Sequence, residues 1–149
     1  MLPYSVPIYR VTLVKEGSLK LEDRPVVSSS YTAANILQNY LQDVDREHFV
    51  VILLDSKNRI IGINTVSIGT LTSSLVHPRE VLKAAIEHNA ARIIVGHNHP
   101  SSDPDPSQED KDITSRLKQG AEIMGIPLLD HIVLGDGNHW FSFRDEGWL

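Results

Sequence analysis

The chain has 149 residues, 41% of them hydrophobic and 22% charged, which fits one globular domain and excludes disordered and fibrous classes. It contains no cysteine, which excludes disulfides, thiolate nucleophiles and cysteine-bound zinc or iron–sulfur clusters. The formal net charge of −5 has the wrong sign for a protein whose main task is to neutralise phosphates, so standalone nucleic-acid binding is disfavoured.

The N-terminal part of the chain lacks the features of a secretory signal, and no apolar run approaches the roughly 20 residues that span a bilayer. We therefore expect a cytoplasmic protein without a membrane segment. Residues 6–14 are β-branched and aromatic, and Gly17 follows, which predicts a strand that turns back into residues 18–21. Ser30 is expected to cap a helix over residues 31–41, where apolar residues recur at helical spacing.

The rest of the chain alternates between strand and helix signals. Pro78 predicts the start of a helix that runs to residue 88, and Ser107 the start of one that runs to about Met124 and ends at Gly125. Three prolines between residues 100 and 106 predict a stiff irregular loop. Short apolar stretches predict strands over residues 48–55, 60–68, 92–97, 128–134 and 139–143. We expect one α/β domain over residues 1–149, a mixed sheet flanked by helices, with residues 1–30 as a strand or hairpin extension.

The segment His97-Asn98-His99 lies at the end of a predicted strand. In a strand, residues i and i+2 point to the same side, so both imidazoles can face one metal ion. The same pattern is also typical of two solvated or hydrogen-bonded histidines without a metal.

Ser107 and Asp110 stand at the start of the predicted helix after the proline-rich loop. A helix cap explains this pair on its own, because Ser caps well and acidic residues are favourable in a first turn. Alternatively, the loop returns the helix start to the histidines, which gives two imidazoles, one carboxylate and an open position, as in catalytic zinc sites. Both interpretations can hold together.

Residues 97–110, HNHPSSDPDPSQED, resemble the H-x-H-x7-S-x2-D metal motif of the JAMM (JAB/MPN+) metalloproteases, in the version found in bacterial RadC-like proteins. Residues 46–49, 76–80 and 129–132 also look like RadC, so the resemblance extends from about Tyr31 to the C-terminus. The family usually has Gly at Ser102, which we expect to affect the loop without touching a ligand. Longer members begin with a helix-hairpin-helix DNA-binding region that residues 1–30 are too short to form.

The resemblance implies a cytidine-deaminase-like JAB/MPN fold and one zinc ion per chain, held by His97, His99 and Asp110. It implies a zinc-dependent hydrolase of peptide or isopeptide bonds, in which Glu47 is the general base and Ser107 donates to the oxyanion. From residue type alone, Glu47 is typical of a solvated surface charge. The expected substrate is a peptide or protein amide.

A second interpretation is a metal-bearing interaction or DNA-repair accessory module with little hydrolysis, since RadC-like proteins have traditionally carried a repair label. The acidic charge predicts that any DNA association is weak and non-specific. Glu80 and Glu109 are weaker candidates for the base than Glu47. We expect His131 to be a hydrogen-bonded structural residue, with a role in orienting a ligand as the alternative.

Overall fold

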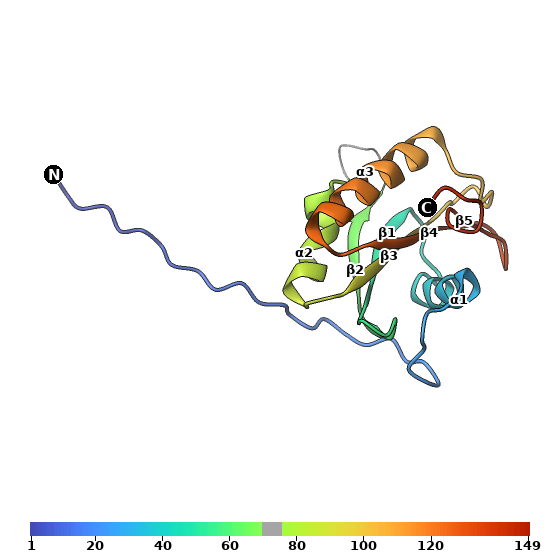
Figure 1. Cartoon of the computed structure of the whole chain (residues 1–149), viewed down its shortest axis with the longest axis horizontal. Helices are drawn as coiled ribbons and strands as arrows, with labels where there is room; N and C mark the ends of the chain where they lie inside the picture. The colour runs from blue at the N-terminus through green and yellow to red at the C-terminus, as the bar shows by residue number, and fades with distance from the viewer. Residues whose placement is uncertain (70–75) are drawn as a thin grey trace.

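The structure, a computed structural model, describes residues 1–69 and 76–149. Its sheet has the strand order β2-β1-β3-β4-β5, and three helices flank it (Figure 1). Among the described residues β3 and β4 pair in parallel and the other neighbouring strands pair antiparallel, which confirms the predicted mixed α/β sheet. The elements are α1 (Ser30–Tyr40), β1 (His48–Leu54), β2 (Ile60–Ile68), α2 (Pro78–Glu87), β3 (Arg92–Asn98), α3 (Gln108–Met124), β4 (Leu128–Leu134) and β5 (Trp140–Ser142).

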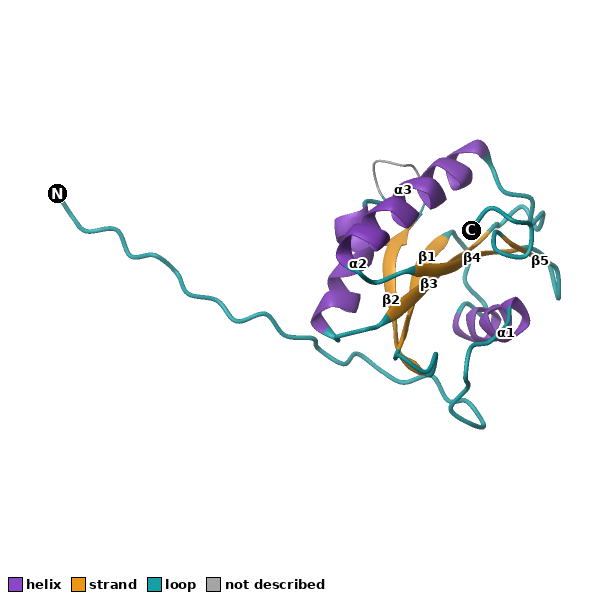
Figure 2. Ribbon diagram, viewed as in Figure 1, coloured by secondary structure: helices purple, strands orange, loops and turns teal. Residues whose placement is uncertain are grey.

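The sheet separates two hydrophobic cores. Helices α2 and α3 cover one face of the sheet and α1 covers the other (Figure 2). Successive residues of β1 alternate between the two cores, so Phe49 and Val51 pack under α2 and α3 while Val50 and Ile52 pack under α1. Burial on both faces explains why β1 reads as a continuous apolar run in the sequence.

The helix ends follow the predicted signals with one shift. Ser107 caps α3, Pro78 is the first residue of α2, and Gly125 ends α3 in the left-handed conformation with φ 69°. Ser30 does not cap α1 as predicted. Ser29 is the cap, because its backbone is extended and its side chain accepts a hydrogen bond from the Thr32 N–H.

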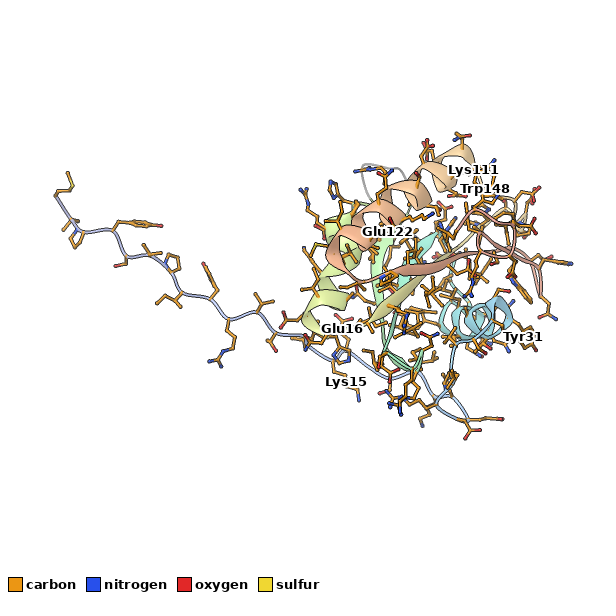
Figure 3. All side chains as sticks on the ribbon, in the orientation of Figure 1. Lys15, Glu16, Tyr31, Lys111, Glu122 and Trp148 are labelled. Carbon is orange, nitrogen blue, oxygen red and sulfur yellow. The ribbon has the colours of Figure 1, made fainter. Side chains whose placement is uncertain are left out.

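Residues 6–14 do not form the predicted strand. Residues 1–17 are exposed throughout and run away from the domain as an extended chain, past Lys15 and Glu16 (Figure 3). The prediction was wrong because β-branched residues favour extended backbone, whereas a strand also needs a pairing partner and a surface to pack on. Later in the chain, Val26 forms an isolated bridge with Arg59, the residue before the edge strand β2.

The C-terminal segment closes the sheet. Strand β5 is one residue shorter at each end than predicted, and Asp130 of β4 anchors the turn that follows it. Its carboxylate accepts hydrogen bonds from the Ser142 hydroxyl at 2.6 Å and the Arg144 N–H at 3.0 Å. Burial raises the pKa of Asp130.

None of the helices in the described part of the chain is long and apolar enough to cross a membrane.

Candidate metal centre

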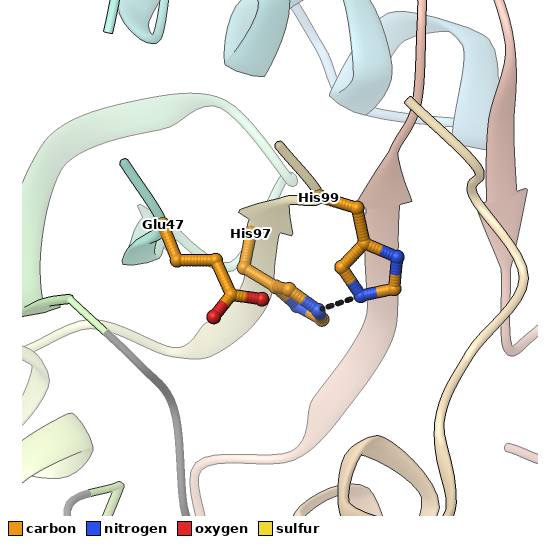
Figure 4. A group of neighbouring side chains, drawn as sticks. All are labelled: Glu47, His97 and His99. Carbon is orange, nitrogen blue, oxygen red and sulfur yellow. Dashed lines mark hydrogen bonds between the residues drawn. The ribbon is translucent and has the colours of Figure 1, made fainter. Parts of the chain in front are cut away.

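Two histidines meet at the C-terminal end of strand β3. His97 is the sixth residue of the strand and is completely buried, and His99 follows the strand with a side chain that is 13% exposed. Their Nε2 atoms lie 3.0 Å apart (Figure 4). The predicted i, i+2 arrangement is therefore present, with both rings turned to the same point.

Asp110 approaches the two histidines from the first turn of α3. One carboxylate oxygen lies 3.2 Å from His97 Nε2, and the other lies 3.0 Å from His99 Nε2. Ser107 and Asp110 form a capping box, in which the Asp110 N–H donates to the Ser107 hydroxyl at 3.1 Å and the Ser107 N–H donates to the Asp110 carboxylate at 2.9 Å. The cap thus orients a carboxylate that also faces the histidines.

The proline-rich loop between His99 and Ser107 is tied to the β4–β5 turn. The Ser102 carbonyl accepts from the Asp136 N–H at 2.9 Å, and a Cβ atom on Gly135 would lie 2.7 Å from Pro104 Cδ. Ser102 itself has φ 72°, a left-handed conformation that favours glycine. The left-handed backbone is a physical reason for the Gly that the family resemblance leads one to expect at this position.

Glu47 lies beside the histidines, directly before β1. Potential ligand atoms of Glu47, His97 and His99 all lie within 4.8 Å of one another, so the three residues form a group that could hold a metal ion (Figure 4). Asn98 holds the backbone on both sides of Glu47: its side chain accepts from the His48 N–H at 2.8 Å and donates to the Arg46 carbonyl at 3.1 Å. The residue between the two histidines therefore positions the glutamate.

The charges of the cluster are strongly coupled. Burial pushes the pKa of Asp110 upward, but hydrogen bonds from His97 and His99 outweigh it and hold that pKa well below its ordinary value. The hydrogen bond to Asp110 raises the pKa of His99. Complete burial, and then the neighbouring His97, hold the pKa of His131 well below its ordinary value. Asp110 is therefore a carboxylate, and His131 is a neutral ring, at physiological pH.

A cavity of about 460 Å³ opens onto the cluster. Ser107 and Glu109 line it, whereas Glu80 forms an ion pair with Lys83 on α2 and is not among the lining residues. In the described part of the chain, the cavity is lined by Glu47, His99, Pro100, Ser101, Asp103, Asp105, Ser107, Glu109 and Asp110. Five of these nine side chains are carboxylates, so the cavity attracts cations and repels phosphates.

A second set of residues supports the cluster from beneath: His131, for which a role in orienting a ligand was one of two expectations, and Thr114, which sequence analysis did not single out. The Nε2 atom of His131, in β4, lies 2.9 Å from the Nδ1 atom of His97. The hydroxyl oxygen of Thr114, in α3, lies 2.6 Å from the Nδ1 atom of His131. The His131 ring packs between two aromatic rings. Phe49 meets it edge-on with the ring centroids 5.5 Å apart, and Phe143 stacks on it with the centroids 4.9 Å apart. The expectation of a hydrogen-bonded His131 agrees with this contact.

The donor set suits a small borderline cation. Two atoms that are each 2.0–2.1 Å from a tetrahedral ion lie about 3.3 Å apart, and the three contacts among His97, His99 and Asp110 span 3.0–3.2 Å. Two imidazoles and one carboxylate are ligands that zinc accepts, and the adjoining cavity leaves a further position accessible to a small molecule. The residues present therefore fit the metal that the sequence motif implies.

A mixed α/β sheet with a histidine and carboxylate cluster at the end of a central strand defines a domain with a candidate metal site. A family model described as RadC-like JAB domain matches residues 27–148. The chain belongs to this family, as the sequence motif had indicated. The match begins after the exposed extended segment of residues 1–17.

Several relatives carry the name UPF0758 protein, which states no activity. One from Desulfitobacterium hafniense and one from Rubrobacter xylanophilus are each 48% identical over 126 residues, which is 85% of this chain and 55% of the relative. One from Bacillus licheniformis is 46% identical over 132 residues, which is 89% of this chain and 58% of the relative. The chain thus spans little more than half the length of these relatives.

Proposed function

We propose that this domain is a zinc-dependent hydrolase of peptide or isopeptide bonds. The observation that carries the proposal is the convergence of His97 Nε2, His99 Nε2 and the Asp110 carboxylate within 3.0–3.2 Å, beside Glu47 and an open cavity. A zinc ion bound there would act as a Lewis acid and lower the pKa of its water. The remaining chemistry belongs to side chains of this chain.

Glu47 is placed to move protons. As a carboxylate at the edge of the cavity it can accept a proton from the attacking water and later return it to the departing amine. The clamp by Asn98 on residues 46 and 48 keeps its backbone fixed during both transfers. Ser107 lines the same cavity, and because its oxygen accepts from the Asp110 N–H, its own O–H is available to donate to an oxyanion.

Metal analysis tests the first half of the proposal. The purified protein should carry close to one equivalent of zinc, and His97→Ala, His99→Ala and Asp110→Ala should each lose it. The exposed His139→Ala is the matched control, since it removes an imidazole that lies outside the cluster and should leave zinc content unchanged. Retention of zinc by all three folded ligand variants would place the metal elsewhere.

Glu47→Gln tests the second half, because it keeps volume and hydrogen-bonding reach but cannot accept a proton. Zinc content and the melting temperature should survive, while turnover on a panel of peptide and lysine ε-amide substrates should fall about 10²–10⁴-fold. Equal turnover in Glu47→Gln and the wild type would refute the mechanism.

The alternative role in DNA repair is less favoured by the charges of the site. Five carboxylates line the cavity, so a phosphodiester backbone that entered it would be repelled. We expect duplex DNA to bind no better than non-specifically and to dissociate as salt is raised. A sub-micromolar complex at physiological salt, specific for a sequence or structure, would reverse this preference.

A further inference from the structure

The hydrogen bonds beneath the candidate metal centre determine where each proton lies. Thr114 Oγ lies 2.7 Å from the Asp110 carbonyl and 2.6 Å from His131 Nδ1. Each of these short contacts is a hydrogen bond that needs one proton, but the Thr114 hydroxyl has only one proton to donate. Because a carbonyl can only accept, the Thr114 hydroxyl donates to Asp110, and the second proton must come from His131 Nδ1.

The proton position on His131 in turn determines the proton position on His97, the expected metal ligand. The His131 ring is completely buried between Phe49 and Phe143, where an imidazolium charge would be costly, so the ring carries one proton. With that proton at Nδ1, its Nε2 atom has a lone pair. That Nε2 atom lies 2.9 Å from His97 Nδ1, and the proton in this contact must therefore belong to His97. Nε2 is thus the nitrogen of His97 that faces His99 and Asp110, and its lone pair becomes available to a cation once it gives up the proton that it shares with Asp110.

A single hydrogen bond determines the proton position on His99. Its Nδ1 atom lies 2.7 Å from the Asp103 carbonyl, which can only accept, so Nδ1 carries a proton and Nε2 is the nitrogen left for a metal. The Nε2 atoms of two imidazoles and a carboxylate thus face one point, and a cation that displaces the protons between them meets three ligand atoms. The difference is that a backbone carbonyl fixes His99, whereas two side chains fix His97.

We propose that Thr114 and His131 are positioning residues that fix the tautomer of His97 and thereby set the affinity of the site for zinc. This inference rests on the proposed function for its zinc readout, but the tautomer itself is a property of the metal-free protein. If Thr114 loses its hydroxyl, His131 Nδ1 loses its acceptor and the ring can move its proton to Nε2. His97 would then accept at Nδ1 and carry its proton on the nitrogen that faces the metal.

Substitutions that preserve shape separate this role from packing. Thr114→Val removes the hydroxyl and keeps the branched side chain, while Thr114→Ser keeps the hydroxyl and removes a methyl group. His131→Phe keeps a ring between Phe49 and Phe143 but removes both nitrogens. Thr65→Val is the control, because it deletes a hydroxyl that bonds Tyr40 on the opposite face of the sheet.

Zinc affinity, measured by competition with a fluorescent chelator, is the first readout. We expect Thr114→Val and His131→Phe to bind zinc 10–100-fold more weakly, the range typical of such supporting contacts. Thr114→Ser should recover most of the affinity, and Thr65→Val should match the wild type even if its melting temperature falls. Wild-type affinity in folded Thr114→Val and His131→Phe would overturn the proposal.

The ring protons of the metal-free wild type are the second readout, and they need neither zinc nor a variant. Long-range ¹H–¹⁵N NMR should show protonated Nδ1 and unprotonated Nε2 for His131, and protonated Nδ1 for His97. A protonated Nε2 on His131 would overturn the proposal. If the wild type fails to bind zinc, the proposed function fails, while the NMR result still decides the tautomer.

Discussion

Ser107→Ala separates the two tasks that Ser107 has in this structure. The substitution removes the oxygen that accepts from the Asp110 N–H at 3.1 Å, but the reciprocal bond from the Ser107 N–H to the Asp110 carboxylate uses a backbone donor and survives. One half of the capping box is therefore lost, at the start of the 17-residue helix α3. Asp110 remains oriented, though less firmly.

The expected loss of stability follows from this geometry. Replacing a Ser cap by Ala costs typically ~1 kcal/mol, within a range of about 0.5–2 kcal/mol. Because Asp110 is only 3% exposed, its N–H has little access to water, and we expect about 1.5 kcal/mol. For a chain of this length each 1 kcal/mol shifts the melting temperature by about 2–4 °C, so calorimetry should show a decrease of about 3–6 °C.

Two further variants complete the assay. Ser29→Ala removes the cap of α1, where the bond from Thr32 N–H is 3.3 Å long and exposed, so it should cost slightly less stability and leave turnover unchanged. Ser107→Asp should restore the melting temperature, because Asp caps as well as Ser, but it cannot donate to an oxyanion. An unchanged melting temperature in Ser107→Ala would refute the capping argument, and full turnover in Ser107→Asp would refute the donor role.

Three further predictions concern the scaffold. Ser102→Gly should raise the free energy of unfolding by about 0.5–1 kcal/mol in calorimetry, because φ 72° suits glycine and both hydrogen bonds are made by the backbone; a loss would contradict the assigned strain. Gly96→Ala should cost about 1–3 kcal/mol in urea unfolding, since its Cβ would clash with the buried Leu37 Cδ1, and the same change should cost less in a Leu37→Ala background. A hydrogen bond from the Arg59 backbone, the first of several, lowers the pKa of Asp55. Its stabilisation is therefore complete above the ordinary carboxyl pKa and disappears as pH falls through the lower folded value, so the difference in urea midpoint between wild type and Asp55→Asn should vanish in acid.

The features predicted well were those with a local cause. The cap at Ser107, the helix start at Pro78 and the stop at Gly125 depend on a few neighbouring residues, and each lies where the sequence placed it. The convergence of His97 and Asp110 was one of two interpretations of the local pattern, and the resemblance to the RadC-like metal motif favoured it over a helix cap alone.

The contacts that sequence analysis did not predict, including the partner of His131, join distant segments of the chain. His131 reaches His97 because Val95 of β3 pairs with His131 in the parallel register, which places the two histidines diagonally on one face of the sheet. Nothing in the local sequence sets that register. The clamp of Asn98 on the residues around Glu47 likewise requires β1 and β3 to lie side by side, with Phe49 opposite His97.

The attachment of the proline-rich loop to the β4–β5 turn has a consequence for ligand binding. Ordering a flexible residue costs about 1–2 kcal/mol of conformational entropy, and ten residues separate His99 from Asp110. Here the prolines, the bond from Asp136 to Ser102 and the close contact of Gly135 with Pro104 already order much of that loop in the folded chain. Binding of a cation therefore requires little further ordering of this loop, and little of the binding free energy is lost to it. Nearly all of that energy adds to the stability of the fold, so the melting temperature should rise with the logarithm of free zinc concentration.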